Sequence, residues 1–134
     1  MEIIVLEGLP DKGKSTTIGI LYQLLLRVGT STNKQPLGGD PKDFSDIVIN
    51  YKNLKIAVFS MGDNSTAISQ AIVNYNNQNC DFFICSLSTG TPKVRANNRI
   101  NQFRNTRISK TVASQSITEN QANDNDANSM FALI

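Results

Sequence analysis

The segment Gly8–Ser15, with the sequence GLPDKGKS, fits the pattern G-x-x-x-x-G-K-[S/T] and stands between two apolar stretches. The stretch before it, Glu2–Leu6, is short and β-branched, which is typical of a buried strand. The stretch after it, Thr16–Val28, is long enough for three turns of helix. Strand, glycine-containing loop and helix in this order are the context that the pattern requires, so we expect an α/β fold built around this loop.

The chemistry of this loop suits a phosphate chain. A loop that closes onto a helix N-terminus points backbone N–H groups inward and adds the positive end of the helix dipole. Gly8 and Gly13 allow a tight turn and a close approach to phosphate. Lys14 is expected to reach the β- and γ-phosphates, and the Ser15 hydroxyl to bind Mg²⁺. The residues expected to contact the nucleotide are Gly8, Pro10, Asp11, Lys12, Gly13, Lys14, Ser15 and Thr16.

Length and composition predict one domain spanning residues 1–134, too small for a large inserted lid or a separate substrate domain. The net charge of +2 is too small to indicate nucleic-acid binding by itself. Cys80 and Cys85 are expected to be buried, reduced thiols, because the chain has no histidine to complete a metal site with them. The first residues resemble a core strand rather than a signal peptide, and no apolar run is long enough for a membrane span. We therefore expect a cytoplasmic protein that does not contact membranes.

Hydrophobic patterning predicts the remaining elements. Gly29 is expected to cap the first helix, and the polar, Pro- and Gly-containing stretch after it to be a loop. Two strands follow so closely that they must be antiparallel, the first of them an edge strand and the second central. A later helix is expected to begin with Thr91 as N-cap and Pro92 at its first position. The expected segments are the loop 30–42, strands 46–51, 54–60, 81–87 and 108–113, and helices over 67–75, 93–104 and 119–133.

The order β-α-ββ-α-β-α-β-α implies three layers, in which helices cover both faces of a mostly parallel sheet. The sheet is expected to have about five strands, one of which is an antiparallel edge strand. The order of the strands within the sheet stays open.

On these residues the chain resembles the P-loop NTPase superfamily, whose phosphate-binding loop is called Walker A. The opening, with Glu7 before Gly8 and Thr16 after Ser15, is most similar to P-loop kinases of the nucleoside monophosphate kinase type, over about the first thirty residues. No Asp-Arg pair or arginine-rich lid of that kind follows. Leu9 stands where the deviant Walker A of ParA/MinD-type proteins has an extra lysine.

A comparison with small GTPases indicates which nucleobase to expect, adenine or guanine. The hairpin followed by Ser60–Asp63 is similar to their Asp-x-x-Gly region but departs from it at Ser60. Ser88–Thr91 stands in place of the guanine-binding Asn-Lys-x-Asp. The resemblance therefore implies ATP as the nucleotide, with GTP less favoured, and Mg²⁺ as the metal.

Asp63 is the best candidate for the acid of a Walker B element, because it follows the apolar strand that ends at Phe59. The alternative is that Asp63 only caps the next helix. Glu7 could act as a base or orient a water, or else be an acid neutralised by Lys12 or the helix dipole. Asp81 begins its strand and so lies at the wrong end of the sheet. Three polar residues at the end of the same strand are expected to border the nucleotide: Ser86, Ser88 and Thr89.

A basic stretch follows, comprising Lys93, Arg95, Arg99, Arg104 and Arg107. Arg95 and Arg99 lie four residues apart on one helix face and could clamp a γ-phosphate, a phosphorylated substrate or nucleic acid. The alternative is a solvated helix face.

The sequence thus predicts Mg²⁺-dependent ATP binding with slow or partner-stimulated hydrolysis, in which Lys14 and Asp63 are the catalytic residues and Ser15 and Asp63 hold the metal. A small-molecule or nucleotide kinase and a non-catalytic nucleotide-dependent switch are the alternatives. A protein partner or a second copy of the chain is compatible with all three, and nucleic acid has weaker support.

Overall fold

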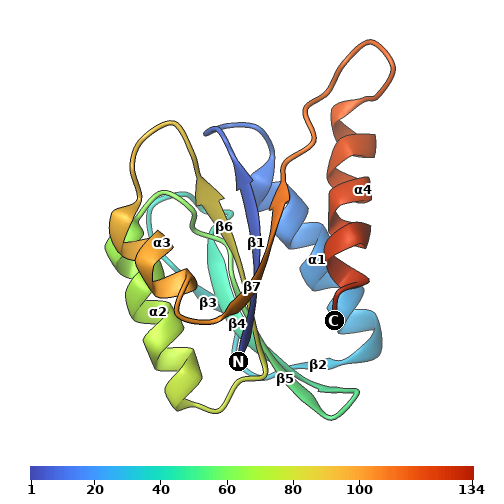
Figure 1. Cartoon of the computed structure of the whole chain (residues 1–134). Helices are drawn as coiled ribbons and strands as arrows, with labels where there is room; N and C mark the ends of the chain where they lie inside the picture. The colour runs from blue at the N-terminus through green and yellow to red at the C-terminus, as the bar shows by residue number, and fades with distance from the viewer.

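The computed structural model describes all 134 residues as a central sheet with helices on both faces (Figure 1). In chain order the elements are β1 (Glu2–Gly8), α1 (Lys14–Val28), β2 (Thr30–Ser31), β3 (Gln35–Pro36), β4 (Phe44–Tyr51), β5 (Leu54–Phe59), α2 (Ser65–Asn77), β6 (Phe82–Ser88), α3 (Val94–Ile100), β7 (Arg104–Ser109) and α4 (Glu119–Phe131). The predicted α/β class with a mixed sheet is confirmed.

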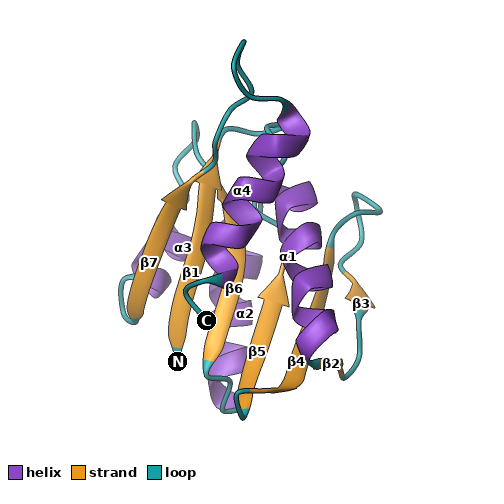
Figure 2. Ribbon diagram, turned by 90° about the vertical axis from the view of Figure 1, so that its right-hand side faces the viewer, coloured by secondary structure: helices purple, strands orange, loops and turns teal.

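The strands are arranged in the order β2-β4-β5-β6-β1-β7, and β3 also pairs with β4. The strands β5, β6, β1 and β7 run parallel, whereas β4 is antiparallel to β5. Figure 2 shows the longer strands β4, β5, β6, β1 and β7 side by side in this order. Because parallel strands end at the same edge, the loops after β1, β5 and β6 meet there, as Figure 1 shows.

Both faces of the sheet are buried. Along β1, Ile3 and Val5 belong to the core beneath α2 and α3, whereas Ile4 and Leu6 belong to the core beneath α1 and α4. Alternate side chains of one strand therefore serve opposite layers, which is why the strand is continuously apolar. Cys85 is buried and unpaired, as predicted, and burial raises the pKa of its thiol to about 12.

The expected antiparallel edge strand was wrong in one respect: β4 is not an edge. The short strands β2 and β3, which lie within the segment predicted to be a loop, both pair with β4. Asp46 explains this arrangement, because its buried carboxylate accepts hydrogen bonds from the Ser31 hydroxyl, the Asn33 N–H (2.9 Å) and the Tyr22 hydroxyl (2.7 Å). The buried Asp46 carboxylate, rather than an apolar pattern, therefore fixes the segment that contains β2 and β3, the β2–β3 ribbon, to the sheet.

Further boundaries differ from expectation. The third helix has Lys93 as its N-cap and begins at Val94, so Thr91 and Pro92 precede it, and it ends at Ile100 rather than at residue 104. The last strand begins at Arg104 rather than Ile108, because β7 pairs with β1 on one side only and needs no continuous apolar run. The first helix does end at Gly29, in extended rather than left-handed backbone.

Candidate functional site

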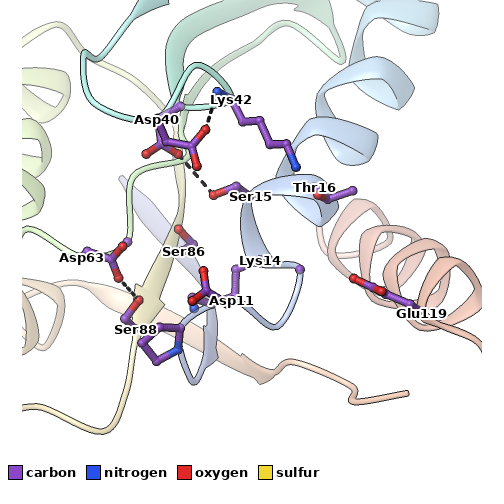
Figure 3. Close-up of a pocket in the computed structure, with 14 residues that line it drawn as sticks. Asp11, Lys14, Ser15, Thr16, Asp40, Lys42, Asp63, Ser86, Ser88 and Glu119 are labelled. Carbon is purple, nitrogen blue, oxygen red and sulfur yellow. Dashed lines mark hydrogen bonds between the residues drawn. The ribbon is translucent and has the colours of Figure 1, made fainter. Parts of the chain in front are cut away.

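A polar cavity of about 290 Å³ lies where β1, β5 and β6 end and α1 begins (Figure 3). No hydrophobic side chain lines it. The lining residues are Pro10, Asp11, Gly13, Lys14, Ser15, Thr16, Asp40, Lys42, Asp43, Gly62, Asp63, Ser86, Ser88 and Glu119. Six of the eight residues expected to contact nucleotide are in this set, whereas Gly8 and Lys12 are not.

The loop between β1 and α1 leaves its backbone donors free. None of the N–H groups from Leu9 to Thr16 donates a hydrogen bond to the backbone or to a side chain. The first amide of this region with a protein acceptor is that of Thr17, which donates to the carbonyl of Gly13 at 2.9 Å. Gly13, at φ 88°, turns the chain into the helix, and Asp11 is also left-handed at φ 60°. The result is a curved row of donors at a helix N-terminus, the geometry that binds anions.

Lys14 places a cation at this loop. Its side chain is buried, and Nζ donates to the carbonyl of Leu9 at 2.8 Å. Burial lowers the pKa of Lys14, and the nearby Lys93 lowers it further, while Asp63 and Asp11 oppose the shift. A desolvated ammonium that lacks a close carboxylate partner gains from an anionic ligand.

Ser15 is held by a carboxylate that the sequence analysis missed. Asp43 Oδ1 accepts hydrogen bonds from Ser15 Oγ and from Ser60 Oγ, each at 3.2 Å. Ser60 Oγ in turn accepts from the N–H of Phe44 at 2.8 Å. Asp43 belongs to the segment between β3 and β4, which contains no motif, so nothing local in the sequence pointed to it.

Asp63 lies on the other side of the cavity and points toward Ser88, whose hydroxyl donates to it (Figure 3). It does not cap α2, because Asn64 is the N-cap and its Oδ1 accepts from the N–H of Ala67 at 2.9 Å. The capping alternative for Asp63 is therefore excluded, but no contact joins Asp63 to Ser15 either. Its assignment to a metal stays a prediction.

Other predicted site residues have different surroundings. Glu7 lies outside the cavity and forms an ion pair with Arg107, so it is a neutralised acid, although its partner is not Lys12. Ser86 donates to the carbonyl of Ser60 at 2.6 Å, which ties β6 to the end of β5. The N–H of Thr89 donates to the carbonyl of Gly8 at 2.9 Å and fixes the loop after β6 against the start of the glycine loop.

The C-terminal helix also supports the loop. An ideal Cβ on Gly13 would lie 2.7 Å from Asn123 Oδ1, and Thr17 Oγ1 lies 3.2 Å from that same oxygen. Farther along α4, Asp126 forms a buried ion pair with Lys110 at 2.8 Å and accepts from Thr111 as well. Neither Asn123 nor Asp126 could be assigned a role from the sequence, because each contact joins residues far apart in the chain.

The residues available for a metal are oxygen donors. No group of three or more Asp, Glu, His or Cys side chains is arranged to hold an ion by itself. Ser15 with Asp43, or with Asp63 across the cavity, could supply one or two ligands. A hard cation such as Mg²⁺ that takes most of its ligands from phosphate and water requires no more than this.

Comparisons of the chain with protein-family models, with curated proteins and with solved structures give no match in any of the three. None of its helices has both the length and the apolar character of a membrane span. The functional interpretation therefore depends on the residues and geometry described above.

Proposed function

We propose that this chain binds a magnesium complex of a nucleoside triphosphate, with ATP as the expected nucleotide. The observation that carries the proposal is the row of free N–H groups from Leu9 to Thr16, of which those of Asp11 and Gly13–Thr16 belong to residues that line the same cavity as the buried Lys14 ammonium. Orphaned donors at a helix N-terminus together with a cation favour a polyphosphate over a neutral or cationic ligand. The absence of hydrophobic lining residues agrees with a site for phosphates rather than for an apolar molecule.

In this proposal each residue of the loop has a defined task. The backbone of Gly8–Thr16 surrounds the phosphates, and Lys14 contacts the β- and γ-phosphates. Ser15 Oγ binds Mg²⁺, and Asp43, which already contacts that hydroxyl, is the nearer of the two candidate acids for the metal shell. The metal would neutralise charge on the phosphates. Asp63 stays the candidate to act near the γ-phosphate.

The proposal includes slow hydrolysis. A fast hydrolase requires a group that orients or deprotonates the attacking water. Glu7 is paired with Arg107 outside the cavity, and Asp63, the acid proposed to act near the γ-phosphate, already accepts a hydrogen bond from Ser88. Stimulation by a protein partner or by a second copy of the chain would supply the missing group.

A switch is the second candidate, and one observation favours it. Asp43, in the segment before β4, accepts a hydrogen bond from Ser15 of the glycine loop. Binding of Mg²⁺ beside Ser15 would therefore change the contacts of that segment. Gly38 and Gly39, both with positive φ, lie in the same segment and have open space around them. The kinase alternative has no such observation in its favour.

The test is a titration of the purified protein with ATP, GTP and ADP, with and without Mg²⁺, followed by thermal unfolding. A ligand at 100 times its Kd stabilises the native state by about 2.7 kcal/mol. We expect a Mg²⁺-dependent increase in Tm with ATP that disappears in Lys14→Ala. Arg27→Ala is the matched control, because it removes one exposed cation at the opposite end of α1. Equal stabilisation of Lys14→Ala and wild type by ATP would overturn the proposal.

A further inference from the structure

A second polar groove is lined by residues of α2 and α3 and of the turn after α3. These two helices cover the face of the sheet opposite α1 and α4 (Figure 1). The volume of the groove is about 360 Å³, and its lining contains neither a hydrophobic nor an acidic side chain. Two arginines, Arg95 and Arg99, project from α3 into this lining. None of the residues of the groove lines the cavity at the glycine loop.

The two arginines differ from the other arginines of the same basic stretch. Arg104 lies 3.9 Å from Glu2, and Arg107 forms an ion pair with Glu7. Arg95 and Arg99 form no ion pair with any carboxylate of the chain. The basic stretch therefore separates into a neutralised part on β7 and an uncompensated part on α3.

Neutral groups hold Arg99 in place, whereas Arg95 is almost without a partner. Arg99 Nε donates to Ser69 Oγ at 3.2 Å, and its Nη1 donates to Gln102 Oε1 at 3.0 Å. Arg95 makes only a 3.5 Å contact with Thr66 Oγ1. A guanidinium has five N–H donors, so most of the donors of this pair have no acceptor in the protein. Residues four apart on a helix lie about 5–6 Å from each other, and two such cations repel unless an anion lies between them or along them.

The chemistry of the groove selects the ligand. Guanidinium groups bind phosphate through two parallel hydrogen bonds. A peptide bound through apolar side chains would require pockets for them, and the groove has none. Sequence-specific reading of a duplex requires an element that projects into its grooves, and a groove between two helices does not project. We propose that the α2–α3 groove binds the phosphate backbone of single-stranded nucleic acid.

The lining also predicts the character of the binding. No aromatic residue lines the groove, so bases have no surface on which to stack and sequence preference should be weak. Backbone contacts of this kind are dominated by release of counterions and weaken strongly with salt. The proposal is independent of nucleotide binding at the glycine loop, because it uses none of the residues of that site.

The test is fluorescence anisotropy with a labelled single-stranded DNA of mixed sequence, in the absence of nucleotide and over a series of salt concentrations. We expect wild-type binding whose logarithmic slope against salt falls by about 0.7 for each arginine removed in Arg95→Gln and Arg99→Gln. The double variant should bind at least about tenfold more weakly at low salt, since two charged hydrogen-bonding groups are lost. Arg27→Gln, which removes an exposed cation from the other face, should bind as the wild type does.

Arg95→Gln keeps the test valid if Arg99→Gln impairs folding, because Arg95 is exposed and has almost no partner in the protein. Competitors separate the possible ligands. Displacement of the DNA by polyglutamate of equal charge concentration would show a general anion site and overturn the proposal, as would binding of inorganic phosphate with no binding of DNA. Equal loss in Arg27→Gln and Arg95→Gln, or no binding at all, would also overturn it. Lys14→Ala should bind DNA normally even if it loses ATP, so failure of one proposal is distinguishable from failure of the other.

Discussion

At the residue scale, the site depends on Asp43, a carboxylate that contacts the hydroxyls of Ser15 and Ser60 and so connects α1 to the end of β5. In the proposed complex, Mg²⁺ lies beside Ser15 Oγ and takes the place of the hydroxyl hydrogen atoms that now contact Asp43 Oδ1. The two candidate acids for the metal shell, Asp43 and Asp63, can therefore be separated by experiment.

Asp43→Asn should weaken binding of the Mg²⁺–ATP complex by about 10- to 100-fold, the range for loss of a group that supports a metal, while ATP without Mg²⁺ binds as before. Calorimetric titration of both forms of ATP measures this difference. Asp124→Asn, an exposed substitution of the same kind on α4, is the control. If Asp63→Asn produces the metal-dependent loss and Asp43→Asn does not, the metal assignment moves to Asp63.

Gly13 gives a second prediction at this scale. Gly13→Ala should lower stability for two reasons: left-handed backbone costs a residue with a Cβ about 1–2 kcal/mol, and the new methyl group would lie 2.7 Å from Asn123 Oδ1. Adding Asn123→Ala to Gly13→Ala should remove the loss of stability that comes from the steric contact, but not the loss that comes from the left-handed backbone. Urea unfolding of the two single variants and the double variant measures the coupling. If the two losses simply add, the contact between α4 and the loop contributes nothing.

The glycine loop was predictable because its chemistry is local: Gly13, Lys14 and Ser15 are neighbours, and all three line the cavity. Asp43 and Asn123 were not, because the first contacts a residue 28 positions away and the second a residue 106 positions away. Asp63 was expected near the glycine loop from its position after a central strand, and it does line the cavity, but its partner Ser88 comes from the next strand of the sheet.

At the element scale, α4 is fixed by a buried ion pair rather than by apolar packing alone. Lys110 and Asp126 have side chains only 1% and 7% exposed, and Thr111 completes the hydrogen bonding of the carboxylate. Burial alone would raise the pKa of Asp126, but hydrogen bonds from Lys110 and Thr111 outweigh it and lower that pKa. The charged pair is therefore the native form.

Lys110→Met should cost about 3–5 kcal/mol of unfolding free energy, because it leaves the Asp126 carboxylate buried without its cation. The variant should also loosen α4 from the glycine loop. Denaturant unfolding measures the stability, with Lys12→Met, at an exposed position, as the control. A loss of no more than that of the control would mean that the pair is dispensable.

The β2–β3 ribbon has its own anchor in Asp46. Burial tends to raise the pKa of Asp46, but hydrogen bonds from Ser31, Asn33 and Tyr22 outweigh this effect and lower it. A lowered folded-state pKa means that the contribution to stability is complete above the ordinary value of 3.8 and is lost as the pH falls through the folded-state pKa.

Wild type should therefore exceed Asp46→Asn in stability at neutral pH by a margin that shrinks below about pH 4. Urea midpoints measured for both proteins from neutral to acidic pH test this expectation. A margin that stays constant on acidification would show that the charge of Asp46 is not what holds the ribbon.

At the scale of the whole molecule, the mixed α/β class followed from the sequence because continuous apolar strands require cover on both faces. The strand order did not, since a hydrophobic pattern selects a face and not a neighbour. The placement of β6 between β5 and β1 is what brings Ser86 and Ser88 to the cavity. The start of β7 and the pairing of the β2–β3 ribbon with β4 were not predicted, because strands at the edge of a sheet need little apolar patterning.

The central claim, that the free amides of the glycine loop bind the phosphates of a nucleotide, is tested most directly by amide chemical shifts. We would titrate ¹⁵N-labelled protein with a slowly hydrolysed ATP analogue and Mg²⁺. The account predicts that the largest shifts occur at Leu9 and at Asp11–Thr16, with a further Mg²⁺-dependent shift at Asp43. Saturable shifts that leave these amides unmoved, or no shifts at all, would contradict it.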